Sequence, residues 1–176
     1  MTGCGIGWMA ASGCVSGWRL DRHRYNPGKH CMCSTPAFTP EVVYLHLTPG
    51  SELPPLSLER FRVLVMIESE VTTVWQKAVS DWLVRSGCLY MMAWGLDCSS
   101  WDDSVDWANI EQFAFEEIPA ESFVLTSWHE NDSLEEVMHF CKHFAVHPSV
   151  KLPTTLLLQI SSQAQKKKVS MLYGSA

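Results

Sequence analysis

The densest group of chemically versatile side chains in this chain lies in the stretch LYMMAWGLDCSSWDDSVDWANIE, at positions 89–111. The stretch ends an apolar run and then presents Trp, Cys, Ser and Asp side chains within a few positions. Trp is a frequent anchor of protein interfaces, and carboxylates around such anchors suit a partner rich in Lys and Arg. We therefore expect a binding surface made of Trp101, Asp102, Asp103, Asp106, Trp107, Trp128 and His129.

Acidic residues dominate the surrounding segment. Positions 86–141 hold twelve Asp and Glu but no Lys or Arg, in a chain of formal net charge -6. The twelve are Asp97, Asp102, Asp103, Asp106, Glu111, Glu116, Glu117, Glu121, Glu130, Asp132, Glu135 and Glu136. A field of one sign attracts cations and repels phosphates. We expect a basic protein, or a metal ion, on this face, and we expect neither nucleic acid nor a membrane as a partner.

Paired carboxylates offer a second, enzymatic interpretation. Glu68 follows one apolar run, Asp97 follows the next, and Glu130 follows a third. Carboxylates that meet in one place can do acid–base work or nucleophilic transfer, which would make the chain a small hydrolase or transferase. Acids after strands also arise from ordinary loops and helix caps, so we favour a non-enzymatic role.

Other catalytic patterns are weaker. Cys98 and His129 can be drawn as a nucleophile and its base, but a reactive thiolate needs nearby positive charge and this neighbourhood is acidic. The sequence has no P-loop, nucleophile elbow or metalloprotease motif. We therefore expect no cofactor.

Histidines at every fourth position raise the question of a metal. His139, His143 and His147 would share one face of a helix, where two His at i and i+4 can chelate a transition metal with Glu136 as an oxygen donor. Exposed His near a helix C-terminus are also favoured by the helix dipole, and we prefer that explanation. No metal site is predicted, with His139 and His143 as weak candidates. A group formed by Cys4, Cys14, Cys31, Cys33 and His30 lacks ordinary zinc spacing.

The strands and helices that position these residues can be predicted from short apolar runs and from helix-capping patterns. Strands are predicted at positions 42–47, 61–67, 88–94, 123–128 and 154–160. Three helices are predicted, from capping boxes of Thr73 with Gln76, Ser100 with Asp103, and Ser133 with Glu136. The first helix stops at Gly87, the second runs from about Trp101 or Ser104 to Phe113, and the third ends at His147.

This alternation of strands and helices predicts an α/β fold. Each parallel return needs a crossover, so we expect an open, mostly parallel sheet of four to five strands with helices on both faces, doubly wound and Rossmann- or flavodoxin-like. In such sheets ligands bind at the carboxyl ends of the strands, where Glu68, Asp97, Trp128, His129 and Glu130 would lie.

The length of 176 residues suits one hydrophobic core. Scattered Gly, Cys and Pro predict an irregular N-terminal tail at positions 1–40, followed by a single α/β domain at 41–162 and a basic C-terminal tail at 163–176. No apolar run approaches the ~20 residues that a membrane-spanning helix needs.

The seven cysteines, an odd number at irregular spacings, favour reduced thiols in a cytoplasmic protein. The stretch at positions 11–14 is similar to the small-residue segment before a lipidated Cys, but no Lys or Arg precedes it, unlike in a signal peptide. We therefore prefer the cytoplasm to secretion.

The run DCSSWDDSVDWAN at 97–109, with WLVRSGCLYMMAWG before it and SWHENDSLEEV after it, resembles an uncharacterised bacterial domain family of unknown function. The resemblance covers about residues 42–161 and implies one compact α/β domain and a bacterial source. It implies no activity. The residues themselves favour an acidic, non-enzymatic binding module for a basic protein, as an inhibitor or immunity protein would be.

Overall fold

Five strands alternate with four helices in the computed structural model, which describes residues 41–176. The strands are β1 (Glu41–Leu47), β2 (Phe61–Ile67), β3 (Cys88–Gly95), β4 (Leu125–His129) and β5 (Thr154–Ile160). The helices are α1 (Thr73–Arg85), α2 (Cys98–Gln112), α3 (Leu134–His143) and α4 (Lys166–Ser175). The predicted N-terminal tail and the Cys and His residues within it lie outside the described residues.

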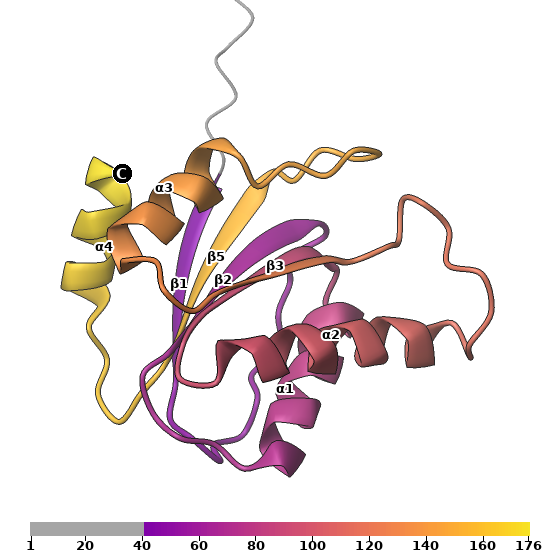
Figure 1. The fold of residues 1–176 in the computed structure, drawn as a ribbon, viewed down its shortest axis with the longest axis horizontal. Coiled ribbons are helices and arrows are strands. Elements are labelled where there is room, and N and C mark those ends of the chain that lie inside the picture. The colour runs from indigo at the N-terminus through magenta and orange to yellow at the C-terminus, as the bar shows by residue number, and fades with distance from the viewer. Residues whose placement is uncertain (1–40) are drawn as a thin grey trace, which may run out of the picture. The chain divides into compact units, whose positions relative to one another are not determined.

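The five strands form one parallel sheet in the order β1-β5-β2-β3-β4 (Figure 1). The central strands β2 and β5 are buried along their whole length, as expected of nearly continuous apolar runs covered on both faces. β1 and β4 lie at the two edges. The prediction of an open, parallel α/β sheet is confirmed.

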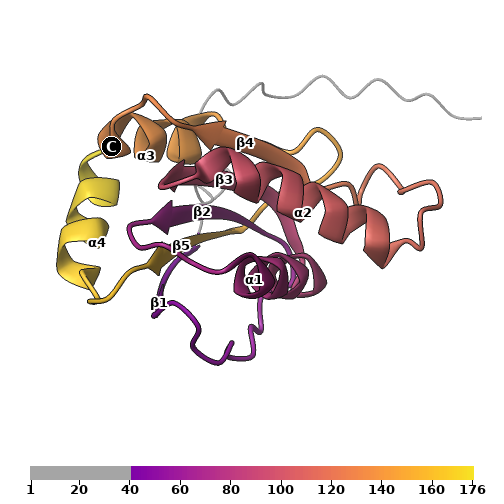
Figure 2. The same ribbon diagram turned by 60° about the horizontal axis from the view of Figure 1, so that its bottom comes forward.

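Helices cover both faces of the sheet (Figures 1 and 2). On one face, Val63 and Val65 of β2 belong to a core cluster with Leu83 of α1. On the other face, Leu64 of β2 belongs to a second cluster with Val137 of α3. Alternate residues of one strand therefore enter opposite cores, as the period of two in a strand requires. The arrangement is doubly wound.

The predicted start of α1 is shifted by one residue. Thr72 is the N-cap, and its hydroxyl accepts a hydrogen bond from the Trp75 backbone N–H at 3.3 Å. The Thr73–Gln76 capping box is wrong because the Gln76 side chain instead donates to the Ser100 hydroxyl at 2.9 Å. The expected stop at Gly87 is confirmed: its φ is 94°, and a Cβ there would lie 2.4 Å from the Glu59 carbonyl oxygen.

The predicted capping box of α2 is also wrong. The helix begins at Cys98, and its N-cap is Asp97, which adopts a left-handed φ of 48° and makes no side-chain cap. Ser100 lies within the first turn, where its hydroxyl donates to the Asp97 carbonyl oxygen at 2.9 Å. The turn between β3 and α2 is therefore formed by backbone geometry rather than by a side-chain cap.

The C-terminal half contains one confirmed and one missed element. The capping box of Ser133 and Glu136 is present at the start of α3. The segment that the sequence predicts as a basic tail forms α4 instead, with Val169 and Tyr173 buried in the second core cluster. These two residues are four positions apart and so share one helical face. Along the part of the chain that the structure describes, none of the helices has the length and apolar character needed to span a bilayer.

Candidate functional site

A groove of about 480 Å³ lies between α1 and α2 and begins at the carboxyl end of β3. It is lined by Thr73, Gln76, Lys77, Asp97, Ser100, Asp103, Ser104, Trp107 and Glu111. Sequence reasoning identified Asp97, Asp103 and Trp107 but missed the contribution of α1. The available signal was the polar residues of α1, of which Thr73, Gln76 and Lys77 line the groove.

Two hydroxyl contacts fix the two helices against each other along this groove. The Gln76 side chain donates to Ser100 at 2.9 Å, and one helical turn further on Ser80 donates to Ser104 at the same distance. Ser80 is fully buried. The paired spacing holds the acidic side chains of α2 in one register relative to α1.

The charges of the groove are mainly negative. Its carboxylates are Asp97, Asp103 and Glu111, and its one cationic side chain is Lys77. The Lys77 ammonium donates to Glu111 at 2.6 Å and lies 3.8 Å from Asp81. The hydrogen bond to Glu111 raises the pKa of Lys77. Lys77 is thus already engaged, which leaves Asp97 and Asp103 available to an incoming cation.

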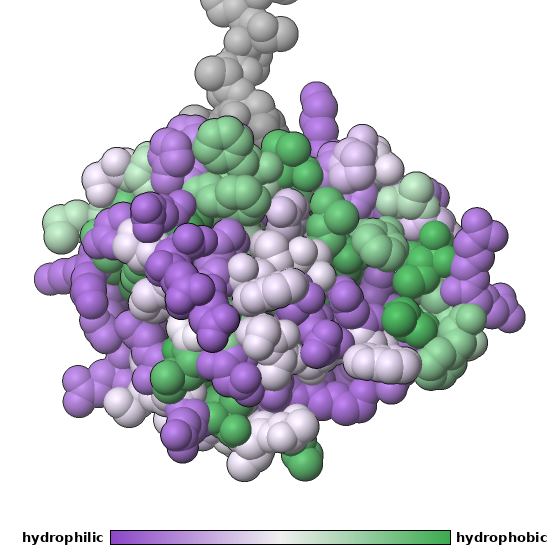
Figure 3. All heavy atoms as spheres, viewed as in Figure 1, coloured by the Kyte–Doolittle hydropathy of each residue, from purple (hydrophilic) through white to green (hydrophobic). Residues whose placement is uncertain are grey.

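Trp107 is the exposed anchor of the groove. Its side chain is 57% exposed and packs edge-on against the ring of Phe115 at 6.4 Å between centroids. Asp103 precedes it by four residues and Glu111 follows it by four, so a carboxylate lies one turn away on either side. Hydrophilic side chains cover much of the face on which α2 lies (Figure 3).

A second pair of carboxylates lies on the side of α2 that faces β4. Thr126 of β4 donates a hydrogen bond to Asp106 at 2.9 Å. One oxygen of Asp102 is buried and has no hydrogen-bond partner among the residues of the described fold. Burial is the main cause that raises the pKa of both carboxyl groups, and Thr126 partly opposes it. Trp128, also on β4, is 53% exposed.

Trp101 is not a surface residue. It is only 1% exposed and lies in the core cluster with Val105 and Ala108. These three residues are spaced i, i+4 and i+7, which is the apolar stripe of α2. The predicted role of Trp101 in binding a partner does not fit this burial, because the sheet already covers its indole.

Of the three carboxylates of the enzymatic interpretation, one lines the pocket at the strand ends. A pocket of about 290 Å³ at the ends of β2 and β3 is lined by Asp97 and Glu70, but by neither Glu68 nor Glu130. Glu68 instead accepts a hydrogen bond from Gln159 of β5. Glu130 is exposed after β4.

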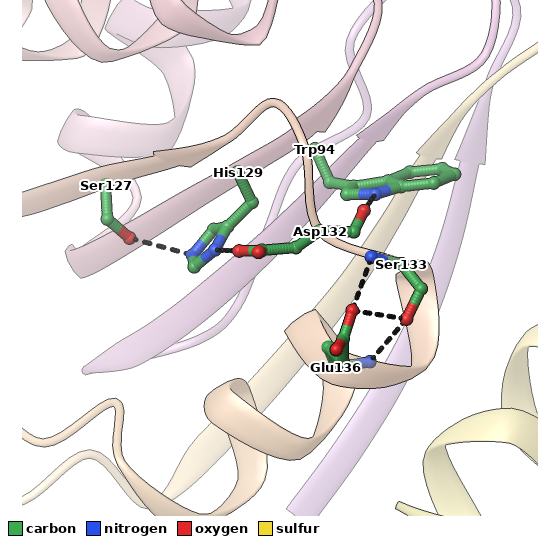
Figure 4. Close-up of polar contacts among 6 residues, drawn as sticks. All are labelled: Trp94, Ser127, His129, Asp132, Ser133 and Glu136. Atoms are coloured by element: carbon green, nitrogen blue, oxygen red, sulfur yellow. Dashed lines mark hydrogen bonds and ion pairs between the residues drawn. The ribbon is translucent and has the colours of Figure 1, made fainter.

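His129 is held within a small polar network (Figure 4). Its Nδ1 lies 2.8 Å from the Asp132 carboxylate, and its Nε2 lies 3.4 Å from the Ser127 hydroxyl. The side chain of His129 is 11% exposed, and its ring centroid is 5.2 Å from that of Phe140. The Ser–His separation is longer than the roughly 2.6–3.2 Å typical of a nucleophile and its base. The burial also leaves little of the ring for the predicted partner contact.

Cys98 is buried, with 1% of its surface exposed. Burial raises the pKa of its thiol, and the nearby Glu130 carboxylate acts in the same direction. Both effects oppose the thiolate form that nucleophilic catalysis requires. The geometry thus agrees with the sequence argument against a Cys–His mechanism.

The three spaced histidines do not share a face. α3 ends at His143, and His147 is buried beyond the helix, where its Nε2 donates to the Phe123 carbonyl oxygen at 2.9 Å. His139 and His143 are exposed, with ring centroids 4.6 Å apart. Glu136 is engaged in the capping box. Within residues 41–176, no group of three or more side chains is arranged to hold a metal ion.

Comparison with protein families gives one match. The model of a domain of unknown function, DUF7684, matches residues 42–176. The match extends past the segment of resemblance seen in the sequence and includes α4. Neither the curated proteins nor the solved structures contain a match to this chain.

Proposed function

The chain belongs to the DUF7684 family of unknown function, and from the geometry of its groove we propose that it is a non-enzymatic binding module for a basic protein segment. The occupant is an extended or helical segment with Lys or Arg side chains, bound along the groove between α1 and α2. An inhibitor or immunity protein that binds a basic partner would work in this way.

The observation that carries this proposal is the surrounding of Trp107. A half-exposed indole with the Asp103 carboxylate one helical turn away offers an apolar surface and an unengaged negative charge, while Glu111 on the other side is paired with Lys77. Arg and Lys side chains can stack their stems or head groups on an indole while they pair with a carboxylate. Such aromatic anchors commonly provide most of the affinity of an interface.

The wider charge distribution supports the same partner. Twelve acidic residues and no Lys or Arg occur at positions 86–141, so negative charge predominates around α2, where Lys77 of α1 is the one cation in the groove. Such a field accelerates the encounter with a basic protein and disfavours nucleic acid. A bacterial source and a cytoplasmic location, which the sequence favours, form part of this proposal.

Fluorescence anisotropy with an end-labelled Lys/Arg-rich peptide tests the proposal. We expect saturable binding that weakens at high salt and is reduced about tenfold or more by Trp107→Ala or Asp103→Lys. Glu135→Lys on α3 is the matched control for charge, because Glu135 is exposed and lies outside the groove. Equal loss of affinity in Asp103→Lys and Glu135→Lys would show that only net charge matters and would contradict a defined groove.

A second candidate, a small hydrolase or transferase, is favoured by one observation. Asp97 is a non-glycine residue in a left-handed conformation, and it lines a pocket together with Glu70 at the strand ends. Backbone strain of this kind often occurs at active sites. Turnover of chromogenic esters, phosphates or glycosides that is lost in both Asp97→Asn and Glu70→Gln would support it, and absence of turnover in the unmodified protein would exclude these substrates.

A further inference from the structure

Arg62, the second residue of β2, is a buried charge. Only 5% of its surface is exposed. Its Nε donates to the Thr155 hydroxyl at 2.8 Å, and its Nη1 donates to the Ala145 carbonyl oxygen at 2.9 Å. A guanidinium has five N–H donors, so these bonds use only part of its capacity. Nη2 makes no hydrogen bond to any residue in the described part of the chain.

No carboxylate within residues 41–176 forms an ion pair with Arg62. The ion pairs of the described fold involve Lys77 and His129, and Arg62 takes part in none of them. Both acceptors of Arg62 are neutral, a hydroxyl and a carbonyl. Taking a cation out of water is costly unless an anion or a full set of acceptors replaces the water. Within the described fold, Arg62 is therefore a buried cation held by neutral acceptors alone.

A cavity of about 430 Å³ opens beside Arg62. Lys142 and Lys151 also line it, and none of the described residues in its wall is an Asp or Glu. The remaining walls are Ala145, Val146, His147, Val150 and Leu152, which are apolar except for the histidine. The cavity thus combines three cationic side chains with an apolar surface, in a protein whose net charge is -6.

His147 belongs to the wall and is not a further cation. Its Nδ1 accepts a hydrogen bond from the Ser149 backbone N–H at 3.2 Å, so the ring proton lies on Nε2, which donates to the Phe123 carbonyl oxygen. Both ring nitrogens are therefore satisfied in the neutral form. Lys142 is partly engaged, since its ammonium donates to the Ala176 carbonyl oxygen at 2.8 Å. Arg62 and Lys151 are left as the principal ligands.

We propose that this cavity binds a small organic anion, an oxyanion head group carried on an apolar body. The free edge of the Arg62 guanidinium and the Lys151 ammonium bind the head group, because a planar guanidinium matches carboxylate and phosphate oxygens. Val146, Val150 and Leu152 contact the body. The cavity lies at the amino ends of β2 and β5, whereas the acidic groove begins at the carboxyl end of β3, so this site is independent of the proposed function.

Isothermal titration calorimetry on the full chain tests the proposal with phenyl phosphate, benzoate and neutral benzyl alcohol. We expect at least one anion to bind and the alcohol not to bind, and the tighter anion identifies the head group. Lys151→Glu places a negative charge at the site and should weaken binding about tenfold or more. Lys167→Glu, an exposed lysine of α4 outside the cavity, makes the same change in net charge and should leave binding intact.

Arg62→Met provides a second variant, with circular dichroism used to establish that it folds. If it folds, it should lose anion binding while retaining the fold. If it does not fold, Lys151→Glu and Lys167→Glu still decide the question. The proposal is overturned if neither anion binds at millimolar concentration, if the alcohol binds as well as the anions, or if both lysine variants bind alike.

Discussion

Asp102 and Asp106 lie one helical turn apart on α2, beside the Thr126 hydroxyl of β4, which donates a hydrogen bond to Asp106. Thr126 makes that bond at 2.9 Å, while one Asp102 oxygen is buried without a partner among the described residues. Burial raises the pKa of both carboxyl groups from the ordinary value of 3.8, and the negative charge of Asp102 raises that of Asp106 further. Their ionised forms are therefore less favourable in the folded state than in the unfolded state.

Replacing Asp102 with Asn should stabilise the protein at neutral pH. A carboxyl group with a raised folded pKa contributes stability below its unfolded pKa, and this contribution is lost as the pH rises through the folded value. Asn carries no charge to desolvate, so the stability gain of Asp102→Asn should appear above pH 3.8 and grow toward neutrality. Thermal unfolding followed across this pH range measures the effect.

Asp103→Asn is the matched control for that substitution, because Asp103 is exposed on the same helix and next in sequence. Surface substitutions of this kind usually change stability by no more than about 0.5 kcal/mol. A gain of the same size in Asp103→Asn would attribute the effect to net charge on α2 and not to the buried oxygen of Asp102.

Truncation of the two Trp residues of α2 should lower the free energy of unfolding by very different amounts. Trp101→Ala removes a side chain that is 1% exposed and should cost about 3–5 kcal/mol of unfolding free energy. Trp107→Ala removes one that is 57% exposed and should cost no more than about 0.5 kcal/mol. Urea unfolding measures both. A large loss of unfolding free energy in Trp107→Ala would mean that the packing of Trp107 on Phe115 supports the fold. This variant could then no longer be used to test partner binding.

Gly95 is required by the turn that leads from β3 into α2. Its φ is 104°, and a Cβ at this position would lie 2.3 Å from the Ile67 carbonyl oxygen. Gly95→Ala should therefore destabilise the fold by about 1–3 kcal/mol through backbone strain, in addition to the contact with rigid backbone. Gly50→Ala is the control, since Gly50 has a φ of 78° but a Cβ added there would meet nothing within 4 Å. Equal losses would show that the conformation matters and the contact does not.

The central strands were predictable because short apolar runs in the sequence indicate strands that are buried on both faces. Continuous apolar runs at 61–67 and 154–160 became the central strands β2 and β5 with the predicted bounds. α4 was not predictable in this way, because only Val169 and Tyr173 of this helix are buried and the Lys residues before them resemble a tail. Tertiary packing, not local propensity, determines that helix.

The site was predictable in its charge but less so in its geometry. The acidic character of α2 follows from the number of Asp and Glu residues in its sequence. Whether each Trp faces the core or the solvent depends on where the helix starts and therefore on which residues share its buried face. The spacing of Trp101, Val105 and Ala108 was a usable signal for the buried face, and Trp107 falls outside it. The buried Arg62 has a signal too, since it interrupts an apolar strand, but its two neutral hydrogen-bond acceptors, Thr155 and Ala145, are 93 and 83 positions away in the sequence.

The capping box of α3 should contribute measurably to stability. Ser133 accepts from the Glu136 backbone N–H at 3.3 Å, and the Glu136 carboxylate accepts from the Ser133 backbone N–H at 2.8 Å. Ser133→Ala should cost about 1 kcal/mol in urea unfolding. The bonds from Ser133 also lower the pKa of Glu136 below 4.5, so this contribution is present above that pH and lost as the pH falls through the folded value. A Ser133→Ala protein should accordingly show a flatter pH dependence of stability below pH 4.5 than the unmodified protein.

The buried thiols should report on opening of the fold. Burial raises the pKa of Cys88 and of Cys141 from 9.0 to about 12, so neither forms a thiolate at pH values near neutrality. Both thiols are protected by low exposure as well. Iodoacetamide should therefore alkylate the peptides that contain these residues only after denaturant is added, as peptide mapping by mass spectrometry would show.

The same pKa shifts predict how stability responds to alkaline pH. In the unfolded chain the two thiols ionise near pH 9.0, whereas in the folded chain they ionise near pH 12. The unfolded state loses its protons first, so the stability that these thiols contribute is fully present below pH 9.0 and is lost between these two values. Replacement of Cys141 with Ala should reduce this alkaline loss, although it also removes a buried side chain. Alkylation of Cys141 in the folded protein at the rate of the denatured chain would show that the core beneath α3 opens freely and would contradict this account.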